Sequence, residues 1–269
     1  MRFAKAHSLG NDFLFVEATA LPDGVELGSL SRAICERHRG IGADGLVIFG
    51  EAYERFSMRI FNCDGSEAEM SGNGLRCLGA VLRFSGRATG DRIDVNTKAG
   101  PRTLELLEAQ GPRFLFRAGM GRPENPQLGV PITIDGQTLH ATTLSMGNPH
   151  ATLFTEALDF DVLRKIGPRI ERHPHFPNRT NVELVHVLDR RAIEVGFWER
   201  GVGETGASGT GASAAAVASI LNGKVDDEVR VRCPGGILDV SWAGRDEVRV
   251  SGEAVVVAEG DYVGAALLP

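Results

Sequence analysis

The chain repeats two short motifs at one spacing, and this duplication constrains its fold more than any other feature. The sequence SLGN at residues 8–11 recurs as SMGN at residues 145–148, which is 137 residues later. The pattern ExxxSGNG at residues 67–74 recurs as ExxxSGTG at residues 204–211, again 137 residues later. Because this offset is close to half of the 269 residues, the sequence predicts two structurally similar halves.

The expected boundary between the halves lies at residues 119–127, where GMGRPENPQ supplies turn-forming residues. We therefore expect an N-terminal half over residues 1–118 and a C-terminal half over residues 119–260. The apolar run YVGAALL, in residues 261–269, needs a packing partner of its own.

Short apolar and alternating runs predict strands in both halves, and each SGxG turn predicts the start of a helix. A further helix is expected over residues 30–37, with Ser29 or Ser31 as its N-cap. Because strands outnumber helices and no regular βαβ alternation appears, the expected class is α+β. The predicted strands are 13–16, 59–61, 151–154, 192–195, 229–232, 237–240 and 248–250, and the paired helices are 75–84 and 212–221.

The two SGxG turns carry the first functional signal. Glycines around Asn73 and Thr210 let the backbone turn sharply, so that several N–H groups at a helix N-terminus point the same way and favour an anion. Ser71 and Ser208 stand at equivalent positions just before these turns. The turns are neither a P-loop, since no GK[ST] follows, nor a dinucleotide-binding fingerprint.

Such symmetry suits the inversion of a carbon that carries a proton. One group removes the proton from one face while a like group delivers a proton to the other, in both directions of the reaction. A cleft between two similar halves supplies that arrangement, and two converging helix N-termini stabilise the enolate-like charge as it develops. This route requires no cofactor.

Composition excludes several other classes of function. A net charge of −6 and a pI near 5.7 leave no basic patch for nucleic acid. No apolar run reaches the ~20 residues of a membrane helix, and the sequence MRFAKAHSLGND lacks a signal-peptide core, so we expect a cytoplasmic protein. Four widely spaced cysteines form no CxxC pair, which predicts reduced thiols and no metal site.

Six stretches make the chain resemble the diaminopimelate epimerase family over nearly its full length. The order and spacing of the stretches also match the family. They are HSLGNDF (7–13), RHRGIGADGL (37–46), NCDGSEAEMSGNGLRC (62–77), SMGNPH (145–150), NRTNVE (178–183) and WERGVGETGASGTGAS (198–213).

The resemblance implies two α+β halves related by a pseudo-two-fold axis, each a curved, mostly antiparallel sheet around a central helix, with the site in the cleft between them. It also implies that residues 261–269 return to the N-terminal half and that the protein is a homodimer. The implied enzyme is an isomerase of lysine biosynthesis that interconverts LL- and meso-diaminopimelate without a cofactor.

The chain departs from this family at the two residues that would transfer protons. The resemblance implies cysteines before GNG and GTG, where this chain has Ser71 and Ser208. A thiol has a pKa near ~8.5, whereas a serine hydroxyl is far less acidic and needs a neighbouring base. The sequence fits either a chain altered to retain its substrate or a natural variant with changed activity. Neither Cys63 nor Cys77 is placed to replace the pair.

The resemblance further implies the roles of the other site residues. Glu199-Arg200 and several amides would contact the charged ends of the substrate, and His150 would assist as a base. Glu199 is also expected to be catalytic, since His150 or Glu199 would activate one of the serines. Capping and turn formation are the alternative roles for the asparagines and glycines, and a structural role is the alternative for His150. Glu67 and Glu204 are expected to cap the helices or stabilise the turns, and Arg76 and Glu183 to be structural. The expected substrate-binding residues are Asn11, Asn62, Gly72, Asn73, Asn148, Asn181, Arg200, Gly209 and Thr210.

Two further functions remain open from the sequence. One is a related isomerase or dehydratase of another α-amino acid; Asn62, Asn181 and Arg200 argue against it, because a small substrate would not need them. The other is a non-catalytic protein that binds diaminopimelate after losing the acid–base pair.

Overall fold

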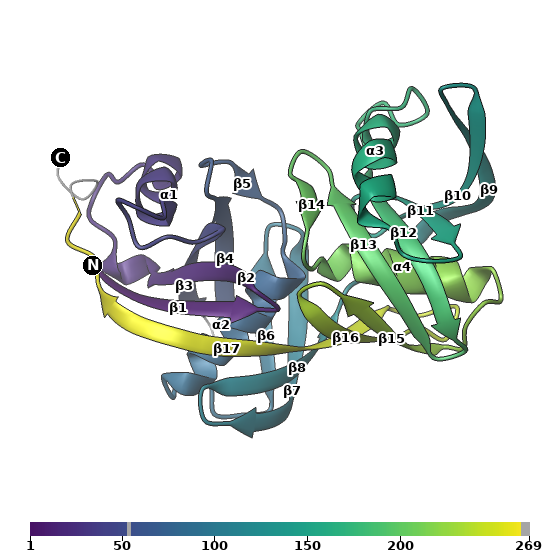
Figure 1. The fold of residues 1–269 in the computed structure, drawn as a ribbon. Helices are drawn as coiled ribbons and strands as arrows, with labels where there is room; N and C mark the ends of the chain where they lie inside the picture. The colour runs from purple at the N-terminus through teal and green to yellow at the C-terminus, as the bar shows by residue number, and fades with distance from the viewer. Residues whose placement is uncertain (53–54, 265–269) are drawn as a thin grey trace. The chain divides into compact units, whose positions relative to one another are not determined.

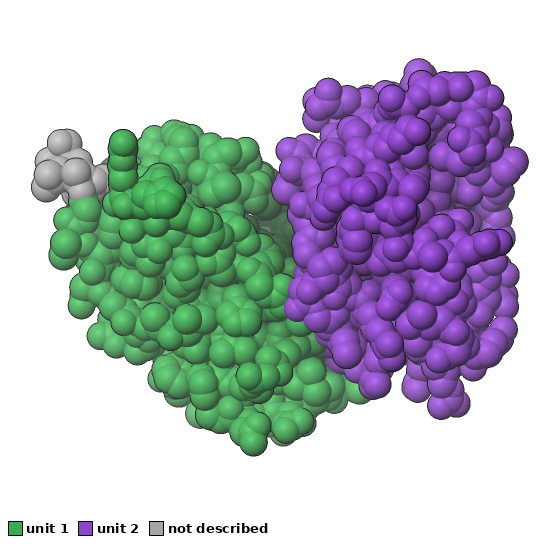
Figure 2. All heavy atoms as spheres, viewed as in Figure 1, with its two compact units in different colours: residues 1–118, 252–269 green, residues 119–251 purple. Residues whose placement is uncertain are grey.

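A computed structural model describes residues 1–52 and 55–264, and it divides into two compact units (Figures 1 and 2). Unit 1 comprises residues 1–118 together with the chain from residue 252 onward. Unit 2 comprises residues 119–251. The chain passes from unit 2 back into unit 1 within a single long strand, β17 (Arg249–Asp261).

Unit 1 is a closed ring of strands around one helix. Successive pairings run β1–β2–β3–β4–β6–β7–β8–β17 and return to β1. The pairs β2–β3 and β4–β6 are parallel, while β1–β2, β3–β4, β6–β7, β7–β8 and β1–β17 are antiparallel. The elements are β1 (Arg2–Ser8), β2 (Asn11–Glu17), η1 (Ala18–Ala20), α1 (Leu27–Cys35), β3 (Gly45–Ala52), β4 (Arg55–Asn62), β5 (Glu67–Ala68), α2 (Gly72–Phe84), β6 (Arg92–Thr97), β7 (Gly100–Gln110) and β8 (Arg113–Gly119).

Unit 2 repeats this topology. Its strands pair in the row β9–β10–β11–β12–β13–β15–β16–β17, with β11–β12 and β13–β15 parallel. Two backbone hydrogen bonds link the two ends of the row. The Met120 N–H donates to the Val248 carbonyl at 2.8 Å, and the Val248 N–H donates to the Gly121 carbonyl at 2.9 Å. The elements are β9 (Glu124–Ile134), β10 (Gln137–Ser145), β11 (Pro149–Thr155), α3 (Phe160–Glu171), β12 (Asn181–Asp189), β13 (Ala192–Glu199), β14 (Gly203–Thr205), α4 (Gly209–Leu221), β15 (Glu228–Cys233) and β16 (Gly236–Ser241).

Strand register shows that the two units are copies of one design. In unit 1, Ile60 lies opposite Ala68; in unit 2, Phe197 lies opposite Thr205, and both pairs are related by the 137-residue offset. From β1 to β8 and from β10 to β17, the order of strands and α-helices, the parallel pairs and the position of the buried helix are also the same. The predicted α+β class with two similar halves is therefore confirmed.

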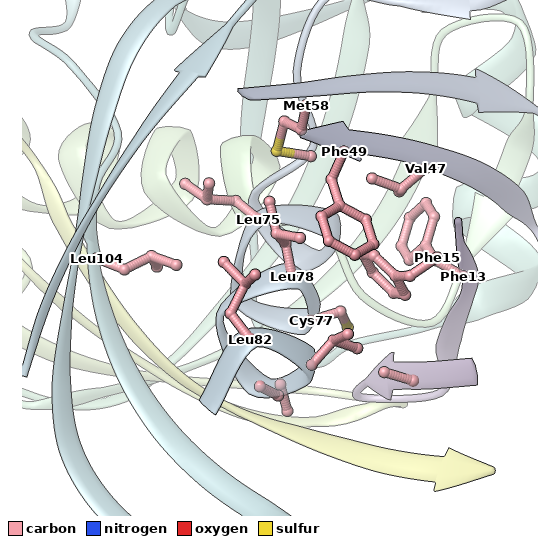
Figure 3. Packing of buried hydrophobic residues seen from close by; sticks show 14 of the residues in the cluster. Phe13, Phe15, Val47, Phe49, Met58, Leu75, Cys77, Leu78, Leu82 and Leu104 are labelled. Atoms are coloured by element: carbon pink, nitrogen blue, oxygen red, sulfur yellow. The ribbon is translucent and has the colours of Figure 1, made fainter. Parts of the chain in front are cut away.

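The central helix α2 is buried from Gly72 to Leu82, so it packs against the strand ring on every side. Leu75, Leu78 and Leu82 project into a cluster of aromatic and aliphatic side chains contributed by the surrounding strands (Figure 3). A Cβ at Gly79 would lie 2.8 Å from Leu104 Cδ1, so only glycine allows the ring to approach this closely.

Helix α4 solves the same packing problem with small residues. Its sequence, GTGASAAAVASIL, is apolar on all faces, as expected for a helix enclosed by strands. Ala212, Ala214, Ala215 and Ala216 each have no exposed surface. Short side chains on all sides keep the helix thin enough to fit inside its sheet.

Two expectations about local structure are wrong. Helix α1 spans Leu27–Cys35 rather than residues 30–37, because the Glu26 carboxylate, not Ser29 or Ser31, accepts the N–H groups of Gly28 and Ser29. Ser31 lies inside the helix, where its hydroxyl donates to the Asn62 carbonyl at 2.8 Å.

The return of the chain to unit 1 occurs earlier than expected, at Gly252 rather than at residue 261. The reason is that β17 continues without interruption from unit 2 to pair with β1, where Gly260 lies opposite Phe3. Tyr262 then exchanges backbone hydrogen bonds with Met1 and is buried in unit 1. The rest of the expected C-terminal segment, residues 265–269, lies outside the described residues.

Replacing Leu78 by alanine tests the enclosure of α2. Leu78 is fully buried, so the change should lower the free energy of unfolding by about 2–5 kcal/mol through lost burial and a residual cavity. Urea denaturation followed by circular dichroism measures this loss. Leu107→Ala is the matched control, because Leu107 is 38% exposed and should lose far less. Equal losses in the two variants would contradict the packing described for α2.

Candidate active site

Ser71 and Ser208 begin the two enclosed helices with the same geometry. Ser71 has φ −138° and ψ 123°, and its Oγ accepts the Gly74 N–H at 3.1 Å. Ser208 has φ −140° and ψ 124°, and its Oγ accepts the Gly211 N–H at 3.2 Å. Each serine is therefore an N-cap that fixes its own hydroxyl at the positive end of a buried helix.

The glycines after the serines are needed for this close approach. A Cβ at Gly211 would lie 2.9 Å from the Phe197 ring and 3.1 Å from Ser208 Cβ. A Cβ at Gly74 would lie 3.3 Å from Ser71 Cβ. The SGxG pattern thus combines an N-cap hydroxyl with the space that the first helical turn requires.

The second duplicated motif forms the turn of a β-hairpin in each unit. SLGN connects β1 to β2 through Leu9 and Gly10, which have φ values of 55° and 84°. SMGN connects β10 to β11 through Gly147, with φ 87°. The asparagine that ends each turn, Asn11 or Asn148, takes part in a network of side-chain hydrogen bonds.

In unit 1, Asn11 contacts the helix that Ser71 begins. Asn11 Oδ1 accepts from Asn73 Nδ2 at 3.1 Å, and Asn11 Nδ2 donates to Asp44 at 2.8 Å. Asn73 Oδ1 in turn accepts from the buried guanidinium of Arg76. Asn62 is exposed, and its Nδ2 donates to Ser66 Oγ at 3.0 Å, outside this network.

In unit 2, the Ser208 hydroxyl is hydrogen-bonded to a carboxylate. Ser208 Oγ donates to Glu199 Oε2 at 3.1 Å, and Thr205 Oγ1 donates to Glu199 Oε1 at 2.7 Å. Burial raises the pKa of the Glu199 carboxyl above its ordinary value, while the hydrogen bonds from Thr205 and Ser208 act in the opposite direction. A carboxyl in this position can exchange a proton with the Ser208 hydroxyl.

The position equivalent to Glu199 in unit 1 is Asn62, since both residues end the corresponding strand and are separated by the 137-residue offset. By the same register, Ala68 stands where Thr205 stands. The carboxyl that contacts Ser208 is therefore replaced by an amide in unit 1. The two serines have the same backbone geometry and different chemical surroundings.

Both ring nitrogens of His150 make hydrogen bonds inside unit 2. It is 1% exposed, its Nδ1 lies 2.6 Å from Glu183 Oε1, and its Nε2 lies 2.8 Å from Asn148 Oδ1. Thr152 Oγ1 also donates to Glu183, at 3.2 Å. These contacts fix the imidazole and, through it, the side chain of Asn148.

Asn181 joins two loops of unit 2. Its Nδ2 donates to the Pro149 carbonyl at 2.9 Å, and its Oδ1 accepts the backbone N–H of Arg200, also at 2.9 Å. The Arg200 side chain is exposed, and its guanidinium donates to the Asn178 carbonyl at 3.3 Å. A guanidinium in such a position remains available to a carboxylate ligand.

Glu67 and Glu204 form ion pairs on the short strands before each serine. Glu67 accepts from Arg59 at 2.8 Å, and Glu204 accepts from Arg164 at 2.7 Å. The carboxylates thus bind arginines of neighbouring elements, β4 and α3, instead of the helix N-termini. The duplicated glutamates therefore anchor the short strands β5 and β14.

Sequence reasoning missed three residues that contact the expected site. Thr205 and Asp44 received no role, and Glu183 was expected to be structural, yet they bond Glu199, Asn11 and His150 respectively. All three lie within the stretches that carry the family resemblance. Their partners are distant in sequence or on another element, so spacing alone gave no signal for the pairings.

The three cysteines of unit 1 occupy core or exposed positions. Cys77 is buried among the core residues around α2, and burial raises the pKa of its thiol far above the ordinary range. Burial likewise raises the pKa of Cys35 to about 11. Cys63 is exposed and follows Asn62, the last residue of β4, so it lies outside that strand.

Solved structures with the same fold are isomerases and related proteins. A hydroxyproline epimerase from Agrobacterium vitis superposes with a TM-score of 0.72 at 16% identity, over 98% of this chain and 92% of that chain. A PhzF-family phenazine biosynthesis protein from Bacillus anthracis superposes with a TM-score of 0.71 at 14% identity, over 97% of this chain and 98% of that chain. Among the described residues, no helix is both long and apolar enough to cross a membrane.

Sequence comparison narrows this fold to one class, the amino-acid epimerases, which are isomerases. The family model for diaminopimelate epimerase matches residues 3–125 and 142–259. The diaminopimelate epimerase of Pelotomaculum thermopropionicum is 44% identical over 276 residues, covering 97% of this chain and 99% of that protein. That of Desulforudis audaxviator is 44% identical over 281 residues, covering 98% and 100%. The chain belongs to the diaminopimelate epimerase family.

The raised pKa of Glu199 predicts a pH dependence of stability. Between the unfolded value near 4.5 and the higher folded value, the native state holds more protons, so stability falls as pH rises through this window. Glu199→Gln should remove this loss, and the variant should gain stability relative to the parent as pH rises from about 4.5. Urea denaturation across this pH range measures the difference.

Glu67→Gln is the matched control with the opposite sign. Its hydrogen bond from Arg59 lowers the pKa of Glu67, so its contribution is present above about 4.5 and is lost as pH falls through the folded value. This variant should therefore lose stability relative to the parent at neutral pH. The same direction of change in both variants would contradict the environment described for Glu199.

Proposed function

We propose that this protein binds diaminopimelate and that Ser71 and Ser208 occupy the two proton-transfer positions at its α-carbon. The observation that carries the proposal is the pair of serine-capped buried helices, one per unit, with matching backbone angles and a carboxyl bonded to one of the hydroxyls. The family membership supplies the substrate class.

The first helical turns would hold the carboxylate next to the reacting carbon. The backbone N–H groups of Gly72, Asn73, Gly209 and Thr210 lie at the positive ends of the two helices. N–H groups at such ends stabilise a negative charge, and they stabilise it further when it grows during formation of an enolate. No cofactor is needed for that step.

The amides and charged groups would bind the remaining ends of the substrate. Asn11, Asn148 and Asn181 would accept or donate hydrogen bonds to its amino and carboxylate groups, and the exposed Arg200 guanidinium would pair with a carboxylate. Asn62 would contribute from unit 1. His150 would position the Asn148 side chain, because its ring contacts both Asn148 and Glu183. It would do so in addition to serving as a base, or in place of that role.

The two serines would differ in their ability to move a proton. For Ser208 to remove the α-proton, its Oγ takes that proton while the Oγ–H proton passes to Glu199, and the electron pair stays on the substrate as the enolate. Ser71 has the amide of Asn62 at the position equivalent to Glu199 and therefore lacks the corresponding acceptor. Exchange should then occur on one side without inversion.

A non-catalytic binding protein is the second candidate. The observation that favours it is the serine at both positions, because a hydroxyl is a much weaker acid than a thiol. The groups proposed to bind the substrate are the same whether the protein is an enzyme or only a binding protein.

We also propose a homodimer located in the cytoplasm and a role in lysine biosynthesis, on the basis of the family resemblance.

One-sided exchange is testable in deuterium oxide. One stereoisomer of diaminopimelate should take up deuterium at the α-carbon with retention of configuration, whereas the other should not. Glu199→Gln should lower that exchange by roughly 10²–10⁴-fold, the usual contribution of a positioned acid or base. Mass spectrometry and NMR follow the label. Glu194→Gln, on the same strand, is the control and should leave the rate unchanged; equal exchange of both isomers would refute the asymmetry.

Restoring thiols tests the assignment of both transfer positions. Ser71→Cys/Ser208→Cys should raise turnover of LL-diaminopimelate by orders of magnitude, while each single change should raise it little, because the two groups act as a unit. A coupled assay of meso-diaminopimelate formation measures the rates. Ser57→Cys, at an exposed strand position, controls for a general effect of a new thiol. Turnover by the unaltered chain equal to that of the double variant would contradict the proposal.

A further inference from the structure

A row of side-chain hydrogen bonds in unit 1 runs from Asp44 to Arg76 through two asparagines. Asn11 Nδ2 donates to Asp44 Oδ2 at 2.8 Å, and Asn73 Nδ2 donates to Asn11 Oδ1 at 3.1 Å. The guanidinium of Arg76 donates to Asn73 Oδ1. The row therefore joins the RHRGIGADGL stretch, which has no role in the proposed reaction, to the first turn of α2.

The chemistry of the two ends gives this row one possible direction. Arg76 carries only donors, so the group facing it must be the Asn73 oxygen. The Asn73 nitrogen then faces Asn11 and requires the Asn11 oxygen as its acceptor. The Asn11 nitrogen is left to face Asp44, whose carboxylate only accepts. Each amide is thus oriented by its neighbours, although an isolated asparagine can exchange its O and N with little change in shape.

Both ends of the row are themselves held in place. Arg76 is fully buried and also donates to Ser8 Oγ, at 3.3 and 3.2 Å; the Ser8 hydroxyl donates to the Glu253 carbonyl at 2.6 Å. Asp44 accepts from the Arg37 guanidinium at 2.8 Å and from the backbone N–H of Asp12 at 3.1 Å. Neither end can reverse its hydrogen-bonding character without losing these contacts.

Unit 2 has no copy of this row. The position of Asn73 is taken by Thr210 and that of Arg76 by Ser213, whose hydroxyl donates to the Gly209 carbonyl. Strand register places Thr180 where Asp44 stands. The duplicated asparagine of unit 2, Asn148, is held by His150 and Glu183 instead. Each copy of this asparagine is therefore fixed, by different partners in the two units.

We propose that Asp44 and Arg76 are positioning residues that orient the amides of Asn11 and Asn73 toward the ligand. The inference rests on the proposed function for the identity of that ligand. With the row intact, each amide keeps one N–H that the row does not use, and these donors suit the carboxylate of an amino acid. If the Asn11 amide reversed, an oxygen would replace that donor and would repel the carboxylate.

Asp44→Asn tests the inference with almost no change in volume. The new amide carries no charge and can donate as well as accept, so the residue 44 end no longer selects the Asn11 nitrogen, and the orientation of the Asn11 and Asn73 amides then depends on Arg76 alone. The dissociation constant of diaminopimelate, measured by calorimetry on the full chain, should rise by about 10-fold, as expected when a hydrogen bond to a charged group is lost.

Asp94→Asn is the matched control. Asp94 is another unit 1 carboxylate that accepts from an arginine and a hydroxyl, Arg92 and Thr103, and it lies outside the row. This change should leave the dissociation constant within about 2-fold of the parent value. An equal loss of affinity in the two variants, or none in Asp44→Asn, would overturn the positioning role.

A second measurement reads the row directly and needs no ligand. In the ¹H–¹⁵N spectrum of the unaltered chain, one side-chain N–H of Asn11 and one of Asn73 should exchange slowly with solvent. Asp44→Asn should shift the Asn73 side-chain signals, although residue 44 does not contact Asn73 in the row, and Asp94→Asn should leave them unchanged.

The two readouts separate this inference from the proposed function. Rapid exchange of these N–H groups in the unaltered chain, or unmoved Asn73 signals in Asp44→Asn, would overturn the row. Slow exchange and shifted signals, in a parent chain that fails to bind diaminopimelate, would support the row and refute the ligand. Because the exchange measurement uses the unaltered chain, it remains decisive even if a variant folds poorly.

Discussion

The structure depends on the complete enclosure of a helix by strands. Once α2 or α4 is enclosed by strands, the N–H groups of its first turn lose access to bulk water, so they require other partners, from the chain or from a ligand. The N-cap hydroxyls of Ser71 and Ser208 supply one such partner each. Because the helix cannot move independently of its ring, the hydroxyl at its N-terminus is fixed as firmly as the core.

The same enclosure explains where the sequence tolerates only small residues. Gly79 allows Leu104 to contact α2, and Gly211 allows the Phe197 ring to contact α4. The alanines of α4 extend this requirement along a whole helix. Residues that sequence reasoning treats as general helix formers are thus selected here by the distance between a helix and its surrounding strands.

Duplication supplies a common scaffold, and substitutions on it create different chemistry in each unit. His150 and Glu183 form a buried polar pair where the register of unit 1 places the apolar Phe13 and Val47. Glu199 similarly replaces Asn62. A buried charged or polar pair is stable only when its hydrogen bonds are satisfied, which they are here, so unit 2 holds titratable groups at positions where unit 1 has Phe13, Val47 and Asn62.

The sequence alone determined that the chain has two similar halves, because repeats are local signals. It also associated each enclosed helix with its SGxG turn, although the helices begin at Gly72 and Gly209, three residues before the expected starts. It did not determine the Glu26 cap of α1, since that carboxylate competes with two nearby serines and only the folded geometry selects it. The contacts of Glu199 with Ser208 and of Asp44 with Asn11 were also decided by tertiary structure. These pairs join separate elements, and their partners are set by strand register and helix position rather than by spacing along the chain.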